Sequence, residues 1–168
     1  MKFEDFLAIV LIVTLVFAAF IFGCVLGINI AYAAEESYDL RTVSGITAEE
    51  IAPFMHPECR HLAEDVIRIC EEEEISAEFI VTVMRWERRP DLHNWFGWTN
   101  NRGRLMRFST DVECLEFCIP AIKRLYLSEN GRYFNGYTVA AVSKYYNNSD
   151  FWRETITAGM EKILNKEA

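Results

Sequence analysis

The sequence predicts a mainly α-helical domain with one small β-hairpin, preceded by an N-terminal hydrophobic helix. Two observations predict the helical domain. Residues 47–164 repeatedly show a capping residue followed by an amphipathic run, which is the signature of a helix start. Only residues 95–108 combine aromatic residues with an Asn/Gly turn, as a hairpin does. A third observation, the absence of charge from residues 6–34, predicts the hydrophobic helix.

Composition excludes several classes of protein. With 51% hydrophobic and 14% aromatic residues, the chain is neither intrinsically disordered nor collagen-like, and 168 residues are too few for a multidomain enzyme. Its 25 acidic and 17 basic side chains give a net charge of −8. Because nucleic-acid binding needs clustered Lys and Arg, we expect no nucleic-acid partner.

The apolar N-terminal segment predicts a location outside the cytoplasm. About 20 apolar residues cross a bilayer, and residues 6–28 exceed the usual length of a signal-peptide core, which favours an uncleaved membrane anchor. The alternative is a secreted protein cleaved near Ala33, since small residues surround that position. We therefore expect an anchor or signal peptide at 1–34, a tether at 35–46 and the folded domain at 47–168.

Helix signals define the elements before the hairpin. Thr47 and Glu50 form a capping box that opens a short helix ending near residue 55. Pro57 suits the first turn of a second helix, running to about residue 73. Ser76 caps a third helix over residues 77–88.

Further caps define the elements after the hairpin. Thr110 and Glu113 form another capping-box signal, which opens a helix that Pro120 should kink or split. Residues 138–145 form the next helix. Ser149 or Asp150 caps the last one, which ends near residue 164.

The folded part has four cysteines: Cys59, Cys70, Cys114 and Cys118. An oxidising exterior would allow two disulfides, but Cys114 and Cys118 are four residues apart on a helix and should not pair with each other. Metal-ligand spacing is lacking around Cys59 and its neighbouring histidines, so buried thiols or one bridge are expected rather than a metal site. We expect no cofactor.

Glu87 is the main candidate for chemistry. It lies three, four and seven residues after Met84, Val83 and Ile80, so helical geometry places its carboxyl on their inward face. A carboxyl against an apolar wall, near a helix C-terminus, is in the environment of a general acid. The alternative is a structural ion pair with a nearby arginine.

Aromatic and amide side chains surround this position in the sequence: Trp86, Asn94, Trp95, Phe96, Trp98, Asn100 and Asn101. Sugar rings stack on aromatic faces and hydrogen-bond to amides, so the set suits a saccharide cleft. An ordinary aromatic core with an Asn-rich turn is the alternative interpretation.

The order of these features resembles a known family. A helix ends in Met84-Arg85-Trp86-Glu87, and a loop Asn94-Trp95-Phe96-Gly97-Trp98 follows. After the hairpin come another helix, then Lys144-Tyr145-Tyr146, then Phe151-Trp152 at the start of the last helix. Across residues 57–163 this resembles the glucosaminidase domain of the lysozyme-like superfamily (glycoside hydrolase family 73 and related endo-β-N-acetylglucosaminidases).

The resemblance implies an α+β lysozyme-like fold and a bacterial enzyme that hydrolyses β-1,4 bonds next to N-acetylglucosamine in peptidoglycan. Glu87 would be the general acid. The substrate-binding residues would be Asn94, Trp95, Phe96, Gly97, Trp98 and one of Tyr145 and Tyr146. We expect glycan strands as the partner, a membrane contact through residues 6–28, and a monomer.

Two departures from the family leave the mechanism open. Arg88-Arg89-Pro90 replaces the usual Ser-Gly after the acid, and residues 92–110 lack the second carboxylate that many members carry. Asp91 and Asp111 are the nearest candidates for that role. Without them, attack by the substrate's own acetamido group or a lytic transglycosylase-like route remains. A catalytically silent wall-binding module and a domain that docks protein partners are the other hypotheses.

Overall fold

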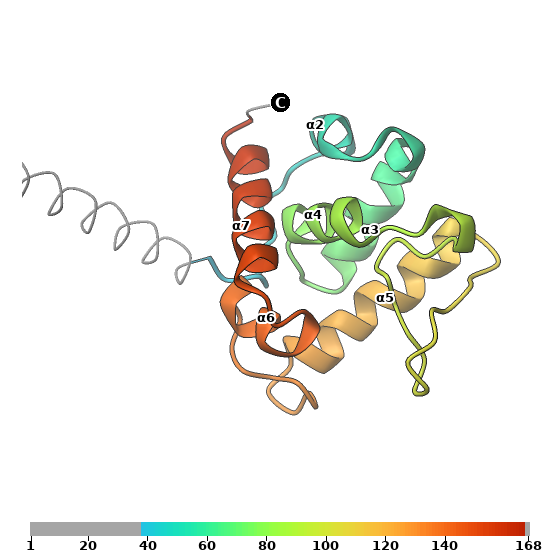
Figure 1. Cartoon of the computed structure of the whole chain (residues 1–168). Helices are drawn as coiled ribbons and strands as arrows, with labels where there is room; N and C mark the ends of the chain where they lie inside the picture. Colours follow the sequence, from blue (N-terminus) through green and yellow to red (C-terminus); the bar gives the residue numbers. More distant parts are fainter. Residues whose placement is uncertain (1–37, 167–168) are drawn as a thin grey trace, which may run out of the picture. The chain divides into compact units, whose positions relative to one another are not determined.

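The computed structural model describes residues 38–166, which fold mainly into helices (Figure 1). The hydrophobic helix predicted within residues 1–34, the cleavage site near Ala33 and the start of the tether lie outside this range. None of the helices within 38–166 combines the length and the apolar character needed to span a membrane.

The elements follow one another with short connections. The α-helices are α2 (Ala48–Ile51), α3 (Ala63–Glu72), α4 (Ala77–Glu87), α5 (Asp111–Tyr126), α6 (Val139–Tyr146) and α7 (Asp150–Leu164). The 3₁₀ turns are η1 (Ala52–Phe54), η2 (Pro57–Leu62) and η3 (Pro90–Leu92). The prediction of a mainly helical chain is confirmed.

Side-chain caps begin α2, α4, α5 and α7 where the sequence predicts them, whereas α3 begins after Leu62 without one. Thr47 and Glu50 form the expected capping box, and Ser76 accepts a hydrogen bond from the backbone N–H of Phe79. Ser149, not Asp150, caps α7. The box predicted at Thr110 is only half made, because the Glu113 carboxylate accepts from the N–H of Ser109 at 2.6 Å instead of from Thr110.

The prolines act differently from the prediction. Pro57 opens the 3₁₀ turn η2, so the expected second helix divides into η2 and α3. Pro120 lies inside α5, which nevertheless runs unbroken through it, so of the two predicted outcomes, a kink or a split, the split is wrong. The missing N–H removes one bond to the carbonyl of Glu116, and that residue is exposed, so water can take the place of the lost donor.

Two other segments differ from their predictions. Residues 98–106 reverse direction around Asn100, whose N–H bonds to Arg104 O at 2.8 Å, but the pairing is limited to one isolated bridge between Thr99 and Leu105. Within residues 38–166 no extended strand forms. In the predicted tether, Leu40 is fully buried, and its backbone forms hydrogen bonds with Tyr137 and Ser76. The folded domain therefore includes residues 38–46, which were predicted to be a tether.

Helix α4 is the centre of the core. Every residue from Ala77 to Met84 is buried, and α4 packs against α3 and α7 (Figure 1). At Gly159 of α7 a β-carbon would overlap the methyl group of Thr82, so the two backbones approach closely because position 159 has no side chain. This contact brings the middle of α4 close to α7.

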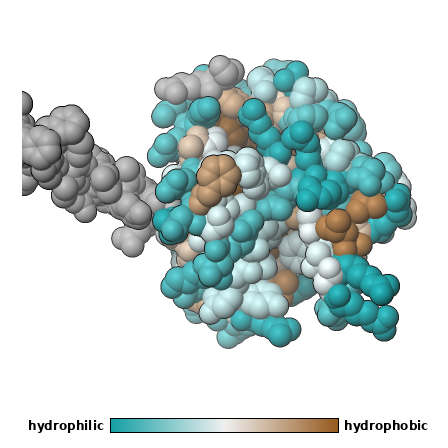
Figure 2. Space-filling view, in the orientation of Figure 1, coloured by the Kyte–Doolittle hydropathy of each residue, from teal (hydrophilic) through white to brown (hydrophobic). Residues whose placement is uncertain are grey.

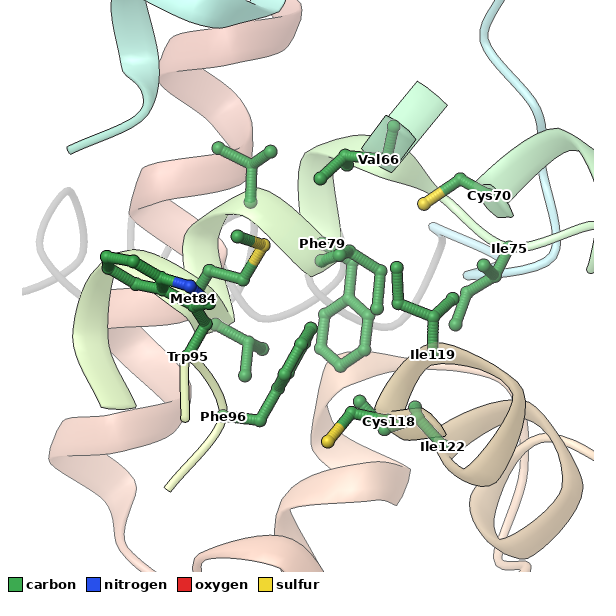
Figure 3. Packing of buried hydrophobic residues seen from close by; sticks show 14 of the residues in the cluster. Val66, Cys70, Ile75, Phe79, Met84, Trp95, Phe96, Cys118, Ile119 and Ile122 are labelled. Carbon is green, nitrogen blue, oxygen red and sulfur yellow. The ribbon is translucent and has the colours of Figure 1, made fainter. Parts of the chain in front are cut away.

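The four cysteines of the described residues are buried free thiols. As expected, Cys114 and Cys118 are not bonded to each other, although their sulfur atoms lie 3.9 Å apart. Burial raises the pKa of Cys59 to about 11 and raises the pKa of Cys70 and Cys118 further. These three thiols therefore stay protonated, and the cysteines pack as small apolar side chains in the core, as Cys70 and Cys118 do in Figure 3.

Candidate active site

Glu87 is the last residue of α4, and the local sequence explains why the helix ends there. Arg88 takes an extended conformation with ψ of 139°, and Pro90, two residues further on, cannot continue an α-helix. The partly buried Glu87 side chain lines a groove of about 640 Å³ that is open to solvent. This volume lies in the range of small-molecule binding sites.

Two donors hold one oxygen of the Glu87 carboxyl group. The indole Nε1 of Trp152 donates to Oε1 at 2.8 Å, and Nδ2 of Asn147 donates to the same atom at 3.5 Å. Trp152 is 1% exposed and stacks on Tyr146 with ring centroids 5.5 Å apart, so its indole has little freedom to move. The first helical turn of α7 therefore orients the acid at the end of α4.

The other oxygen, Oε2, lies beside Gly97. A β-carbon at position 97 would lie 3.1 Å from Oε2 and 3.2 Å from the Glu87 carbonyl oxygen. Gly97 also has φ of +59°, which side-chain-bearing residues rarely adopt. Glycine at this position both permits the turn and leaves space for the carboxyl group.

Three arginines lie close to Glu87 in the sequence, and an ion pair with one of them is the alternative role for this residue. Arg85 donates to the carbonyl of Phe54 at 3.4 Å, and Arg88 donates to Arg85 O at 3.1 Å. Arg89 donates to Arg88 O at 2.8 Å. These guanidinium groups donate to backbone carbonyls, whereas the carboxyl group of Glu87 accepts hydrogen bonds from neutral donors.

The groove brings together four segments of the chain: the end of α4, the loop at 96–101, the end of α5 with the loop that follows it, and the end of α6. Its walls are formed by Glu87, Phe96, Gly97, Trp98, Thr99, Asn100, Asn101, Leu125, Tyr126, Arg132, Tyr133, Tyr146 and Asn147. Aromatic and amide groups predominate, and Glu87 is the one carboxylate among these lining residues. A second cavity beside Ile46 and Ile75 has only about 10 Å³, which is space for one water molecule.

Two of the predicted binding residues are structural in the fold. Asn94 is fully buried, and its side chain bonds to both backbone groups of Trp98 and to the carbonyl of Met106, at 2.8–2.9 Å. Trp95 is 2% exposed, and its indole donates to Asp111 Oδ1 at 2.9 Å. Neither lines the groove; Trp95 packs in the core near Met84 (Figure 3).

The remaining loop residues do reach the groove. The Phe96 ring is buried in the core, so Phe96 contributes backbone to the groove wall, and its carbonyl accepts from the Tyr146 hydroxyl at 2.9 Å. Trp98 is half-buried and makes edge-on contacts with Phe117 and Tyr146. Of the predicted aromatic residues of this loop, Trp98 is the one placed to offer part of its ring to a ligand.

The structure distinguishes the two adjacent tyrosines. Tyr146 lines the groove, and burial together with the neighbouring Glu87 carboxylate raises its pKa well above the ordinary value. It therefore stays a neutral donor. Tyr145 is 57% exposed, lies outside the groove, and its ring packs 5.8 Å from that of Tyr133.

Neither candidate for a second carboxylate reaches the groove. Asp111 accepts from Trp95 and lies 2.7 Å from Nδ1 of His93, so it holds the loop against the start of α5. Asp91 is exposed on η3. Within the described residues no cluster of three His, Cys, Asp or Glu side chains could hold a metal ion.

Sequence reasoning missed several residues of the site. Trp152 was visible only as part of a motif, and Asn147 follows the tyrosine pair without a signal of its own. Tyr126, Arg132 and Tyr133 come from the end of α5 and the loop after it, where no motif occurs. Their contribution depends on packing between distant segments.

Comparisons of this chain with protein-family models, with curated proteins and with solved structures found no match.

Proposed function

We propose that this domain is a lysozyme-like glycosidase that cleaves β-1,4 bonds next to N-acetylglucosamine in peptidoglycan, with Glu87 as the general acid. The observation that carries the proposal is the position of Glu87. It ends a buried helix, faces a groove lined by aromatic and amide groups, and has one oxygen held by the indole of Trp152. Glycans need this combination of stacking surface, amide partners and a proton donor.

The proposed chemistry uses one protein carboxyl group. Because the indole of Trp152 can only donate, it occupies Oε1, and the proton for transfer is carried on Oε2. Glu87 gives this proton to the glycosidic oxygen as the bond to the anomeric carbon breaks. The acetamido oxygen of the substrate then closes on the anomeric carbon. A water molecule opens that ring and returns a proton to Glu87.

This route fits a groove in which Glu87 is the one lining carboxylate, because the substrate's acetamido group takes the place of a second carboxylate as nucleophile. A lytic transglycosylase-like route, in which a hydroxyl of the sugar itself attacks the anomeric carbon, also needs no second protein carboxylate. The products separate the two routes: hydrolysis adds one water molecule to the released fragment, whereas the lytic route adds none, and mass spectrometry measures the difference.

The substrate fits the location expected for the chain. Peptidoglycan lies outside the cytoplasm, where a domain held by a membrane anchor at residues 6–28, or released by cleavage near Ala33, would meet it. The surface shown in Figure 2 is largely hydrophilic, with hydrophobic side chains in small separate patches, as an exposed domain requires.

Clearing of purified cell walls by the full-length protein tests the proposal. We expect Glu87→Gln to lower the rate by about 10²- to 10⁴-fold, the usual contribution of a general acid. Glu154→Gln is the matched control, since Glu154 is exposed on α7 and does not line the groove. Equal clearing by wild type and Glu87→Gln would refute the assignment of the acid.

A silent wall-binding module is the second candidate, favoured by the missing second carboxylate in the groove. It predicts that the wild-type protein binds purified wall fragments without releasing either reducing ends or anhydro-sugar ends. Release of either product by wild type, lost in Glu87→Gln, would exclude it.

A further inference from the structure

The groove is lined by one acidic and one basic side chain. Among its lining residues, Glu87 lies at the end of α4, and Arg132 lies in the loop between α5 and α6. The other lining side chains are aromatic, amide, hydroxyl or aliphatic groups, which suit a neutral sugar. The presence of a guanidinium in the groove of a chain with net charge −8 therefore calls for a separate explanation.

The loop that carries Arg132 is fixed by the end of α5. Gly131 packs so closely that a β-carbon there would lie 2.6 Å from the carbonyl oxygens of Arg124 and Leu125. Tyr133 N–H donates to Leu125 O at 2.9 Å, and the Tyr133 ring packs 5.2 Å from the ring of Tyr126. The backbone on both sides of Arg132 is thus anchored to the helix.

The side chain of Arg132 is also held in position. Its guanidinium carbon lies 5.3 Å from the centre of the Tyr133 ring, within the range of a cation–π contact. Within residues 38–166, no carboxylate forms an ion pair with it, unlike Arg41 and Arg68, which are paired with acidic side chains. An exposed guanidinium held beside a groove keeps its planar set of N–H donors available for a ligand.

We infer that Arg132 binds a carboxylate carried by the bound glycan, so that the groove selects acidic saccharides over neutral ones. The inference rests on the proposed function and deepens it. On peptidoglycan strands from which the stem peptides have been removed, the lactyl ether of each N-acetylmuramoyl unit supplies such a carboxylate, whereas chitin has none. The paired N–H donors of arginine match the two oxygens of a carboxylate, and the resulting hydrogen bonds are stronger than those between neutral groups.

Binding measurements on uncleaved ligands test the inference without relying on activity. The full-length Glu87→Gln variant in detergent is titrated calorimetrically with three tetrasaccharides. These are a muramoyl tetrasaccharide with free lactyl carboxylates, the same compound with the carboxylates converted to methylamides, and chitotetraose. Arg132→Gln is added in the same background, and Arg60→Gln is the matched control, because Arg60 is exposed on η2 and does not line the groove.

We expect Arg132→Gln to weaken binding of the free-carboxylate ligand about 10-fold while binding of the other two ligands changes little. Arg60→Gln should change none of the three. Equal weakening for all three ligands, or no weakening, would overturn the role of Arg132 while leaving the proposed function in place. If the Glu87→Gln protein binds none of the saccharides, the inference fails together with the proposed substrate class.

Discussion

The contact between Trp152 and Glu87 gives the sharpest test of how the site is organised. Trp152→Phe removes the N–H that donates to Oε1 at 2.8 Å, and it keeps a ring where Trp152 now stacks on Tyr146. A hydrogen bond to a charged group contributes about 1.5–3 kcal/mol. If that free energy orients the acid in the transition state, the catalytic rate should fall about 10- to 100-fold.

Steady-state kinetics on soluble glycan strands separate this positioning role from a structural one. Trp152 does not line the groove, so we expect Trp152→Phe to lower kcat while KM stays close to the wild-type value. A general loosening of the fold would instead change KM as well. The free energy of unfolding in urea should also fall by about 2–4 kcal/mol, because the smaller ring leaves a cavity in addition to the lost hydrogen bond.

A double-mutant cycle on stability identifies the partner. Glu87→Ala and Trp152→Phe, measured singly and together, should show a coupling free energy of about 1–3 kcal/mol, since each variant removes the same contact. Additive effects on stability, or wild-type kcat in Trp152→Phe, would refute the idea that this indole orients the acid.

Two further variants test other features. Gly97→Ala should lower activity about 10- to 100-fold, because the new β-carbon would press on Oε2 of Glu87. Gly103→Ala is the control: Gly103 also has a positive φ, +69°, but a β-carbon there would meet no atom within 4 Å, so this variant should show only the backbone strain. Equal activity of the two variants would contradict this account. Burial raises the pKa of Tyr126 from its ordinary value of 10.0 to about 12. The neutral phenol therefore stabilises the fold below pH 10, and about 2 kcal/mol should be lost as pH rises from 10 to 12. Urea unfolding at pH 9 and 12 should show that loss in wild type and a smaller one in Tyr126→Phe; equal losses would count against it.

Much of the fold could be predicted because helix starts are encoded locally. Thr47, Ser76, Thr138 and Ser149 each accept a hydrogen bond from an N–H three residues ahead in the sequence, so no distant contact is needed to recognise them. Pro120 shows the limit of local rules: whether a proline breaks a helix depends on whether the freed carbonyl can reach water.

The site was predictable only where it depends on helix periodicity. The spacing after Ile80, Val83 and Met84 correctly placed Glu87 beside the apolar side of α4, although its role as an acid stays a prediction. Periodicity does not say which aromatic residue of a loop is buried. Trp95 became a core residue because Asp111, sixteen positions later, accepts its N–H, and a contact of that range is set by the tertiary fold.

The contact between α4 and α7 makes the proposed site dependent on the last helix of the domain. The acid and the indole that holds it are 65 positions apart, and the helices meet where Gly159 admits the side chain of Thr82. A chain truncated after Asn147 would keep every residue of the groove wall and still lack the group that aims the proton donor. On the proposed function, a copy of the domain without α7 would be inactive, and the intact copy would become active only once its last helix has docked.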